Sequence, residues 1–218
     1  MSKHLQNDLE RLRKAVLEIG AHVEENLTRS ITSLTARDRI LAEAVIEGDH
    51  EIDRREVRVE EECLKILALH QPVAKDLRFV VAILKLNNDL ERVGDLAVNI
   101  AQRALSLAST ARVPIPEHLE EMAQKAKIML TKSFDALVDS NSSLANEVCA
   151  ADDDVDMLNR DMFQWIQNEI KKSPELVEEY IQLLSVTRHL ERIADQATNI
   201  AEDVIYMVEG NVVRHHRH

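Results

Sequence analysis

The chain has 218 residues, of which 30% are charged and 45% are hydrophobic, a balance that excludes an intrinsically disordered protein. It has only four glycines, four prolines, three phenylalanines, two tyrosines and one tryptophan, which excludes most sheet-rich folds because sheets need turn residues and favour aromatics. A formal net charge of −12 argues against direct binding to nucleic acid or anionic lipid. We therefore expect an all-α fold.

Hydrophobic periodicity predicts six helices, which in chain order span residues 3–35, 38–70, 72–111, 117–139, 143–171 and 174–209. In the first helix, apolar residues recur at spacings of four and three from Leu5 to Leu27. The third helix carries a similar hydrophobic stripe from Ile83 to Leu107. Stripes of this kind must pack against partner helices, so we expect helical bundles.

Prolines divide the predicted helices. Pro72 and Pro174 are expected to begin helices, with Ser173 as the N-cap in front of Pro174. The segment 113–116, Val-Pro-Ile-Pro, cannot lie inside a helix, and it separates residues 1–112 from residues 113–218. We expect each part to form a three-helix bundle, with the two bundles related by pseudo-twofold symmetry.

The two parts are internal repeats. The segment LERVGDLAVNIA at 90–101 returns 100 residues later as LERIADQATNIA at 190–201, with eight of twelve positions identical. The preceding helices also match, since Asp49-x-x-Ile52-Asp53 corresponds to Asp152-x-x-Val155-Asp156 at an offset of 103 residues.

The repeated segment carries acidic and amide side chains at four-residue intervals: Glu91, Asp95 and Asn99 in the first copy, and Glu191, Asp195 and Asn199 in the second. Residues four apart on a helix share a face, so the oxygens of each set can approach one ion. This face points away from the hydrophobic stripe, so we expect both sets to be exposed.

Counting residues around the helix turns places more carboxylates beside these sets. Glu91 lies twenty residues after the turn near residue 71, so Asp49 and Asp53 should lie at the same height on the preceding helix. The same count around residue 173 places Asp152 and Asp156 beside the second acidic pair. The sequence thus predicts two sites of four carboxylates each.

A bound cation would offset the repulsion within these sites, where Asp49, Asp53, Glu56 and Glu60 form one row. Hard oxygen ligands suit a divalent or trivalent metal ion, and iron, zinc, manganese, magnesium and calcium all stay open. Two alternatives need no metal: the acids are solvated surface groups, or they persist only from an ancestral duplication.

Basic residues near these sites also have two interpretations. Arg92 and Arg192 either bind a phosphate or a partner's carboxylate, or form salt bridges that orient Asp95 and Asp195. The mixed charges of residues 75–78, at a helix start, either assist anion binding or are solvated.

An enzyme is not indicated. A ferritin-like oxidase needs paired Glu-x-x-His motifs, and only Glu47-x-x-His50 fits, without a counterpart in the second repeat. No glycine-rich phosphate loop and no catalytic triad pattern occurs. A purely structural helical scaffold remains the other alternative.

The remaining features indicate an intracellular setting. Cys63 and Cys149 lack metal-finger spacing and are expected to be buried structural thiols. The first residues form no apolar signal, and the run Phe79–Leu84 is too short to span a bilayer, so we expect a cytoplasmic protein. The His/Arg tail at 214–218 is expected to be a disordered end without function.

The sequence resembles the PhoU family of phosphate-transport regulators in three places: the doubled Leu-Glu-Arg-[Val/Ile]-x-Asp-x-Ala-x-Asn-Ile motif, the segment Gln71-Pro72-x-Ala74-x-Asp76-Leu77-Arg78, and Asp49-x-x-Ile52-Asp53. The resemblance covers residues 3–210. It implies two three-helix bundles, each with an E(D)xxxD metal motif, here Glu91/Asp95 and Glu191/Asp195.

The resemblance also implies a non-enzymatic cytoplasmic homodimer. Its partners would be the ATPase subunit of the phosphate-specific ABC transporter and the associated sensor histidine kinase, so that it restrains uptake and represses the phosphate-starvation response. Near the predicted sites, the second repeat has His189 for Asp89, Arg188 for Asn88, Asn159 for Glu56 and Phe163 for Glu60. We therefore expect a second site that has fewer carboxylates or is loaded differently.

Overall fold

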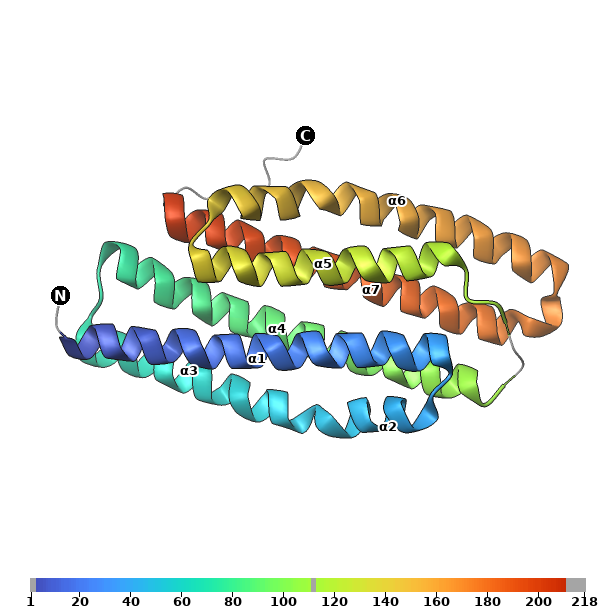
Figure 1. The fold of residues 1–218 in the computed structure, drawn as a ribbon, viewed down its shortest axis with the longest axis horizontal. Coiled ribbons are helices and arrows are strands. Elements are labelled where there is room, and N and C mark those ends of the chain that lie inside the picture. Colours follow the sequence, from blue (N-terminus) through green and yellow to red (C-terminus); the bar gives the residue numbers. More distant parts are fainter. Residues whose placement is uncertain (1–2, 111–112, 211–218) are drawn as a thin grey trace.

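The computed structural model describes residues 3–110 and 113–210, and these residues form an all-α fold (Figure 1). The helices are α1 (Lys3–Ala36), α2 (Arg39–Gly48), α3 (His50–His70), α4 (Ala74–Ala108), α5 (Glu117–Asp139), α6 (Ser142–Lys172) and α7 (Val177–Glu209), with a short 3₁₀ turn η1 (Pro174–Leu176) before α7.

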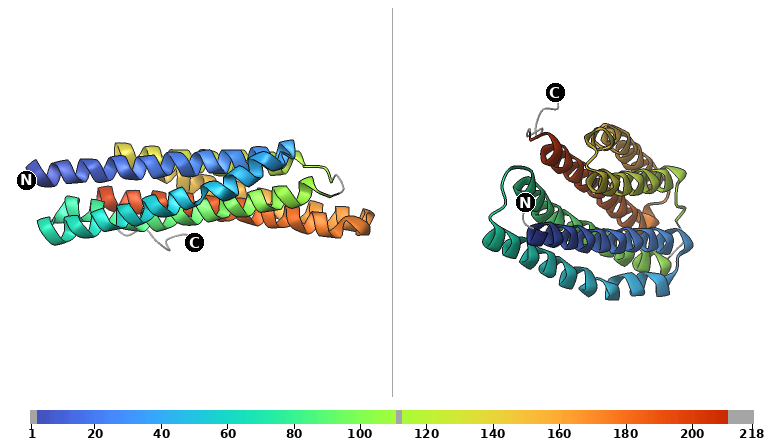
Figure 2. Two further views of the ribbon diagram at one scale, coloured as in Figure 1. Left: turned by 90° about the horizontal axis from the view of Figure 1, so that it is seen from below. Right: turned by 60° about the vertical axis from the view of Figure 1, so that its left-hand side comes forward.

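The helices form two bundles that lie side by side, with α1 to α4 in the first repeat and α5 to α7 in the second. Figure 2 shows from two further directions that the long helices run roughly along one axis. The bundles meet where α4 packs against α7 and α1 packs against α5. The predicted fold class is therefore confirmed, while the exact division after residue 112 stays a prediction.

The hydrophobic stripes form the core. Every apolar residue of the stripe from Ile83 to Leu107 is buried, and in the stripe from Leu5 to Leu27 only Leu9 is half-buried. The buried side chains of both repeats belong to one continuous cluster. Burying each Leu or Ile stabilises the fold by about 1.5–3 kcal/mol, so this shared core holds the two repeats together.

The single helix predicted over 38–70 is interrupted. It consists of α2 and α3, which meet at Asp49, and the bend is visible in Figure 1. Asp49 keeps helical angles (φ −61°, ψ −37°), and the Ile52 amide donates to the Asp49 carbonyl at 2.8 Å, a spacing of three residues rather than four. Gly48, a poor helix former, ends α2 at this point. The break places Asp49 at a helix junction.

The prolines mark helix starts with a small offset. Pro72 lies two residues before the first residue of α4, and Pro174 opens the 3₁₀ turn η1 rather than α7. Ser173 occupies the N-cap position of η1 in front of Pro174, as predicted, but its side chain makes no capping hydrogen bond. Ser173 precedes Pro174 and has non-helical angles (φ −137°, ψ 72°), because a proline disfavours helical angles in the residue before it. The turn η1 then leads directly into α7.

Arginine side chains satisfy carbonyl groups at helix ends, which otherwise lack partners. Arg13 of α1 donates to the Val138 carbonyl near the end of α5 at 2.7 Å. Arg78 of α4 donates to the Met207 carbonyl near the end of α7 at 3.2 Å. Both bonds join the first repeat to the second.

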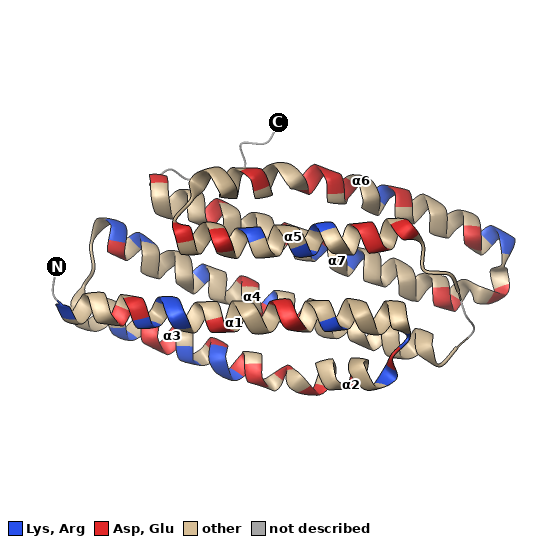
Figure 3. Ribbon diagram, viewed as in Figure 1, with Lys and Arg blue, Asp and Glu red and all other residues tan. Residues whose placement is uncertain are grey.

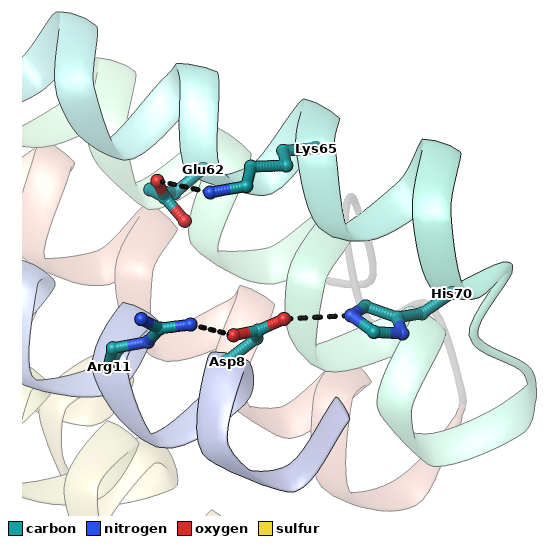
Figure 4. A network of polar contacts seen from close by, with 5 residues as sticks. All are labelled: Asp8, Arg11, Glu62, Lys65 and His70. Atoms are coloured by element: carbon teal, nitrogen blue, oxygen red, sulfur yellow. Dashed lines mark hydrogen bonds and ion pairs between the residues drawn. The ribbon is translucent and has the colours of Figure 1, made fainter. Parts of the chain in front are cut away.

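A polar contact also fastens the start of α1 to the end of α3 (Figure 4). The Asp8 carboxylate lies between Arg11 and the His70 ring, with 2.7 Å from Asp8 Oδ2 to His70 Nε2. The hydrogen bonds from His70 and then from Arg11 lower the pKa of Asp8.

The predicted burial of the cysteines is confirmed for Cys63 and only in part for Cys149. Cys63 is buried, and burial raises the pKa of its thiol to about 12. Cys149 is half-buried and packs against the core. Within residues 3–110 and 113–210, no helix is long and apolar enough to cross a membrane. The tail at 214–218 lies outside the described residues.

Candidate functional site

The first carboxylate cluster lies where the α2–α3 junction faces α4. A Cβ atom built on Gly94 would lie 3.5 Å from Asp49 Oδ1 and 3.5 Å from Ile52 Cδ1. Asp49 therefore packs directly over the α4 backbone, beside Asp95. The break between α2 and α3 brings Asp49 to this position.

Electrostatic coupling shows that the predicted carboxylates converge. Burial raises the pKa of Asp49, and the neighbouring charges of Asp53 and Asp95 raise it further. Burial also raises the pKa of Glu91, with Asp95 next in importance and a smaller effect of Asp53. The α2–α3 junction, α3 and α4 therefore bring Asp49, Asp53, Glu91 and Asp95 within electrostatic reach of one another, as the residue count predicted.

The second carboxylate cluster repeats this arrangement between α6 and α7. Burial raises the pKa of Glu191, followed by the charges of Asp195 and Asp156. Burial raises the pKa of Asp195, followed by Asp152 and Asp156. The four predicted carboxylates of the second repeat, Asp152, Asp156, Glu191 and Asp195, are thus also brought together.

Glu56 belongs to the first cluster as well, although it was not among the predicted ligands. Burial raises its pKa, followed by the charges of Glu60 and Glu91. The buried Asn87 of α4 donates to the Glu56 carbonyl at 3.0 Å and to its Oε1 at 2.8 Å, which holds Glu56 against α4. The signal in the sequence was its position, one helical turn after Asp53.

This anchor is absent from the second repeat. Asn159 stands where the first repeat has Glu56, and Thr187 stands where it has Asn87. The Thr187 hydroxyl donates to the Leu183 carbonyl of its own helix at 2.9 Å. The second cluster therefore has four coupled carboxylates, whereas the first has six when Glu56 and Glu60 are counted.

The predicted exposure of these sets holds in part. Asp53, Glu60, Asp95 and Asp195 are exposed, whereas Glu91, Glu191 and the other coupled carboxylates are half-buried. Figure 3 shows Asp and Glu positions (red) along the long helices of both repeats, with Lys and Arg positions (blue) among them. Asn99 and Asn199 are half-buried, and Asn99 lines a groove between α4 and α7, so their role as ligands stays a prediction.

The donor groups fit a hard cation, but they are not arranged as a finished site. Carboxylate oxygens are the ligands that such ions prefer, and the raised pKa values reflect burial and negative charges that are only partly balanced. Within residues 3–110 and 113–210, no group of three or more His, Cys, Asp or Glu side chains is placed so as to hold a metal ion. Ligation would need rotation of these partly exposed side chains.

Arg92 does not form the salt bridge to Asp95 that was one of its two expected roles. Arg92 lies 4.0 Å from Asp89 Oδ1, so its ion pair is with Asp89 rather than with Asp95. This pairing arises because Asp89 lies one turn earlier on α4 and is nearly buried, whereas Asp95 turns outward. Lys75 and Asp76 line a cavity of about 470 Å³ between the repeats.

The Glu-x-x-His motif lies on the surface. Glu47 is exposed at the end of α2, and the His50 side chain is 88% exposed. A di-iron centre needs its ligands inside a bundle, so these two residues do not form one.

Comparison with known proteins agrees with this architecture. The model of the PhoU domain matches the chain twice, over residues 16–104 and 119–204. The "Phosphate-specific transport system accessory protein PhoU homolog" of Clostridium acetobutylicum is 35% identical over 212 residues, covering 97% of each chain. The "Phosphate-specific transport system accessory protein PhoU" of Escherichia coli strain K12 is 32% identical over 219 residues, covering 99% of this chain and 91% of that one.

Solved structures show the same fold. The crystal structure of PhoU from Pseudomonas aeruginosa superposes with a TM-score of 0.92 at 33% identity, covering 94% of this chain and 99% of that chain. This family consists of accessory proteins of transport, which confirms the expectation of a non-enzymatic protein. The sequence repeats, the paired bundles and the matching relatives together place the chain in the PhoU family.

Proposed function

We propose that this protein is a metal-binding regulator of phosphate uptake and phosphate-starvation signalling. The observation that carries the proposal is the presence of two matching carboxylate clusters, one per repeat, on outward faces that the core does not require. Packing alone does not explain why charges that repel one another recur in both repeats.

A cation would act as a clamp between helices. In the first cluster, Asp49 and Asp53 come from the α2–α3 junction, while Glu91 and Asp95 come from α4. A cation shared by these groups would relieve their repulsion and fasten the junction to α4. It would also reduce the negative charge of an outward face on which a partner protein can dock.

The relatives suggest the partners, because they are described as accessory proteins of the phosphate-specific transport system. We propose that the chain forms a homodimer and docks on the cytoplasmic ATPase subunit of the phosphate ABC transporter and on the associated sensor histidine kinase. It would thus reach the membrane through protein partners, and it would restrain uptake and signalling when phosphate is plentiful.

A complementation experiment tests the regulatory proposal. A strain that lacks the gene should express phosphate-starvation genes in high phosphate, and the wild-type gene should restore repression. The variant Glu91→Gln/Asp95→Asn should restore it poorly, whereas the control Glu43→Gln/Glu61→Gln, which removes two exposed charges outside the clusters, should restore it fully. Repression that persists without the gene would contradict the proposal.

A further inference from the structure

A groove of about 400 Å³ lies between the repeats rather than within either of them. It is bounded by α4 and α7, and its lining residues are Arg92, Asp95, Leu96, Asn99, Arg192 and Gln196. The two arginines occupy equivalent positions in the doubled motif. The two carboxylate clusters each lie within one repeat, and Asp95 of the first cluster also lines this groove.

Two contacts show that the groove lies at the centre of the α4–α7 crossing. Arg103 of α4 donates to Gln182 of α7 at 3.1 Å, and Lys85 of α4 contacts Asp203 of α7 at 3.1 Å. Arg103, near the end of α4, meets Gln182, near the start of α7, while the earlier Lys85 meets the later Asp203, so the two helices are antiparallel. The midpoint between the two contacts lies beside residue 94 on α4 and beside residues 192 and 193 on α7. The pseudo-twofold axis therefore passes between Arg92 and Arg192.

Both guanidinium groups are exposed beside this groove. The Arg92 side chain is 63% exposed, and its distance of 4.0 Å to Asp89 is at the outer limit of an ion pair. Arg192 is also exposed, and although burial and like charges raise the pKa of the nearby Glu191 and Asp195, the charge of Arg192 partly offsets that rise. A planar guanidinium binds the oxygens of phosphate or carboxylate through paired hydrogen bonds, so two of them on opposite sides suit an ion with several equivalent oxygens.

The other lining residues narrow the choice of anion. Asn99 supplies an amide donor, whereas the Asp95 carboxylate only accepts hydrogen bonds. Gln196 has a buried side-chain oxygen without a hydrogen-bond partner among the described residues. At neutral pH phosphate keeps a proton and can both donate and accept, whereas sulfate can only accept. A lining with both donors and acceptors therefore favours phosphate over sulfate.

We propose that the groove between Arg92 and Arg192 binds inorganic phosphate. The two arginines hold its oxygens from both repeats, Asn99 donates a further bond, and the phosphate hydroxyl donates to Asp95 or Gln196. Phosphate binding through the two arginines requires no bound metal, although Asp95 is shared with the first carboxylate cluster. A phosphate ion bound here would add hydrogen bonds between α4 of the first repeat and α7 of the second.

Titration calorimetry with the full-length, EDTA-treated protein in phosphate-free buffer at pH 7 tests the proposal. Sodium phosphate should bind saturably at one ion per chain, and sulfate should bind at least about tenfold more weakly. Arg92→Gln or Arg192→Gln alone should weaken phosphate binding about tenfold or more, because each removes a charge-assisted hydrogen bond. Arg92→Lys should lose less, since it keeps the charge. The control Arg11→Gln/Arg58→Gln, which removes two exposed arginines on α1 and α3, should bind like the wild type.

The proposal is overturned by no saturable binding of phosphate, by unchanged phosphate binding of Arg92→Gln/Arg192→Gln, or by sulfate binding as tight as that of phosphate. Adenosine monophosphate serves as a second probe, and binding of this ester without binding of inorganic phosphate would also overturn it. Manganese content of Arg92→Gln/Arg192→Gln should match that of the wild type, which separates this site from the proposed metal sites. Circular dichroism checks that each variant is folded.

Discussion

Replacing Glu91 by glutamine removes one negative charge from the first carboxylate cluster at nearly constant size. We expect this change to stabilise the cation-free protein and to weaken its stabilisation by a cation. Both effects have the same cause. Burial and the charge of Asp95 disfavour the negative charge of Glu91 in the cation-free protein, but that same charge would bind the metal.

The magnitude follows from the neighbours of Glu91. Asp95 lies four residues later on the same helix and Asp53 faces it from α3, while Arg92 partly offsets them. A like-charge pair at this spacing destabilises a helix by about 0.2–0.5 kcal/mol. Two such neighbours give about 0.5–1 kcal/mol, because solvent screens these partly exposed groups. For a chain of this size that corresponds to a rise in Tm of about 1–4 °C.

A bound cation should reverse the order of the two Tm values, so that the wild type becomes more stable than Glu91→Gln. At a free concentration one hundred times its Kd, one bound ion stabilises the wild type by about 2.7 kcal/mol. The Tm should then rise by about 5–10 °C in the wild type and by much less in Glu91→Gln.

Differential scanning calorimetry in EDTA and in Mn²⁺ provides the assay. Glu61→Gln, an exposed acid on α3 outside the cluster, is the matched control and should behave like the wild type in both buffers. The reasoning is refuted if Glu91→Gln lowers the Tm in EDTA, or if Mn²⁺ raises both values of Tm equally.

Three further predictions concern stability. Asp49, Glu56, Glu91, Glu191 and Asp195 have pKa values raised by burial, so their contribution to stability is complete below their unfolded pKa and is lost as the pH rises through the folded pKa. In EDTA, urea unfolding should therefore show that Glu91→Gln/Glu191→Gln gains stability over the wild type as the pH rises from about 4.5 to 7, and a constant difference would contradict this. Asn87→Ala should lose about 1–2 kcal/mol in urea unfolding, because Asn87 joins α3 to α4 through two hydrogen bonds, and an unchanged midpoint would argue against that link. Gly94→Ala should gain up to about 1 kcal/mol, because its added methyl group meets its nearest atoms at 3.5 Å and alanine favours the helix; a loss of stability would show that Asp49 cannot yield.

The helices could be predicted because their patterns are local. The stripe from Ile83 to Leu107 lies entirely in the core, and the prolines lie within three residues of helix starts. The break at Asp49 could not be predicted, because both neighbouring segments keep helical periodicity and the backbone angles at Asp49 are still helical. The hydrogen bonds around this residue and the bend between α2 and α3 (Figure 1) reveal the junction.

The convergence of the carboxylates could also be predicted, because two helices joined by a tight turn keep their residues at equal heights. The facing of Arg92 and Arg192 across one groove could not, since a repeat does not specify which faces of its two copies meet. That arrangement depends on long-range contacts such as Lys85 with Asp203. The role of Asn87 as a partner of Glu56 likewise needed the packing of α3 on α4.

Metal stoichiometry of the purified protein tests the central claim most directly. After loading with Mn²⁺ and removal of free ions, elemental analysis should find bound metal in the wild type. The variants Glu91→Gln/Asp95→Asn and Glu191→Gln/Asp195→Asn should each lose part of this metal, and the combined variant should lose all of it. The control Glu43→Gln/Glu61→Gln should keep the wild-type content. Metal content that is unchanged in the combined, folded variant would contradict the assignment of both clusters.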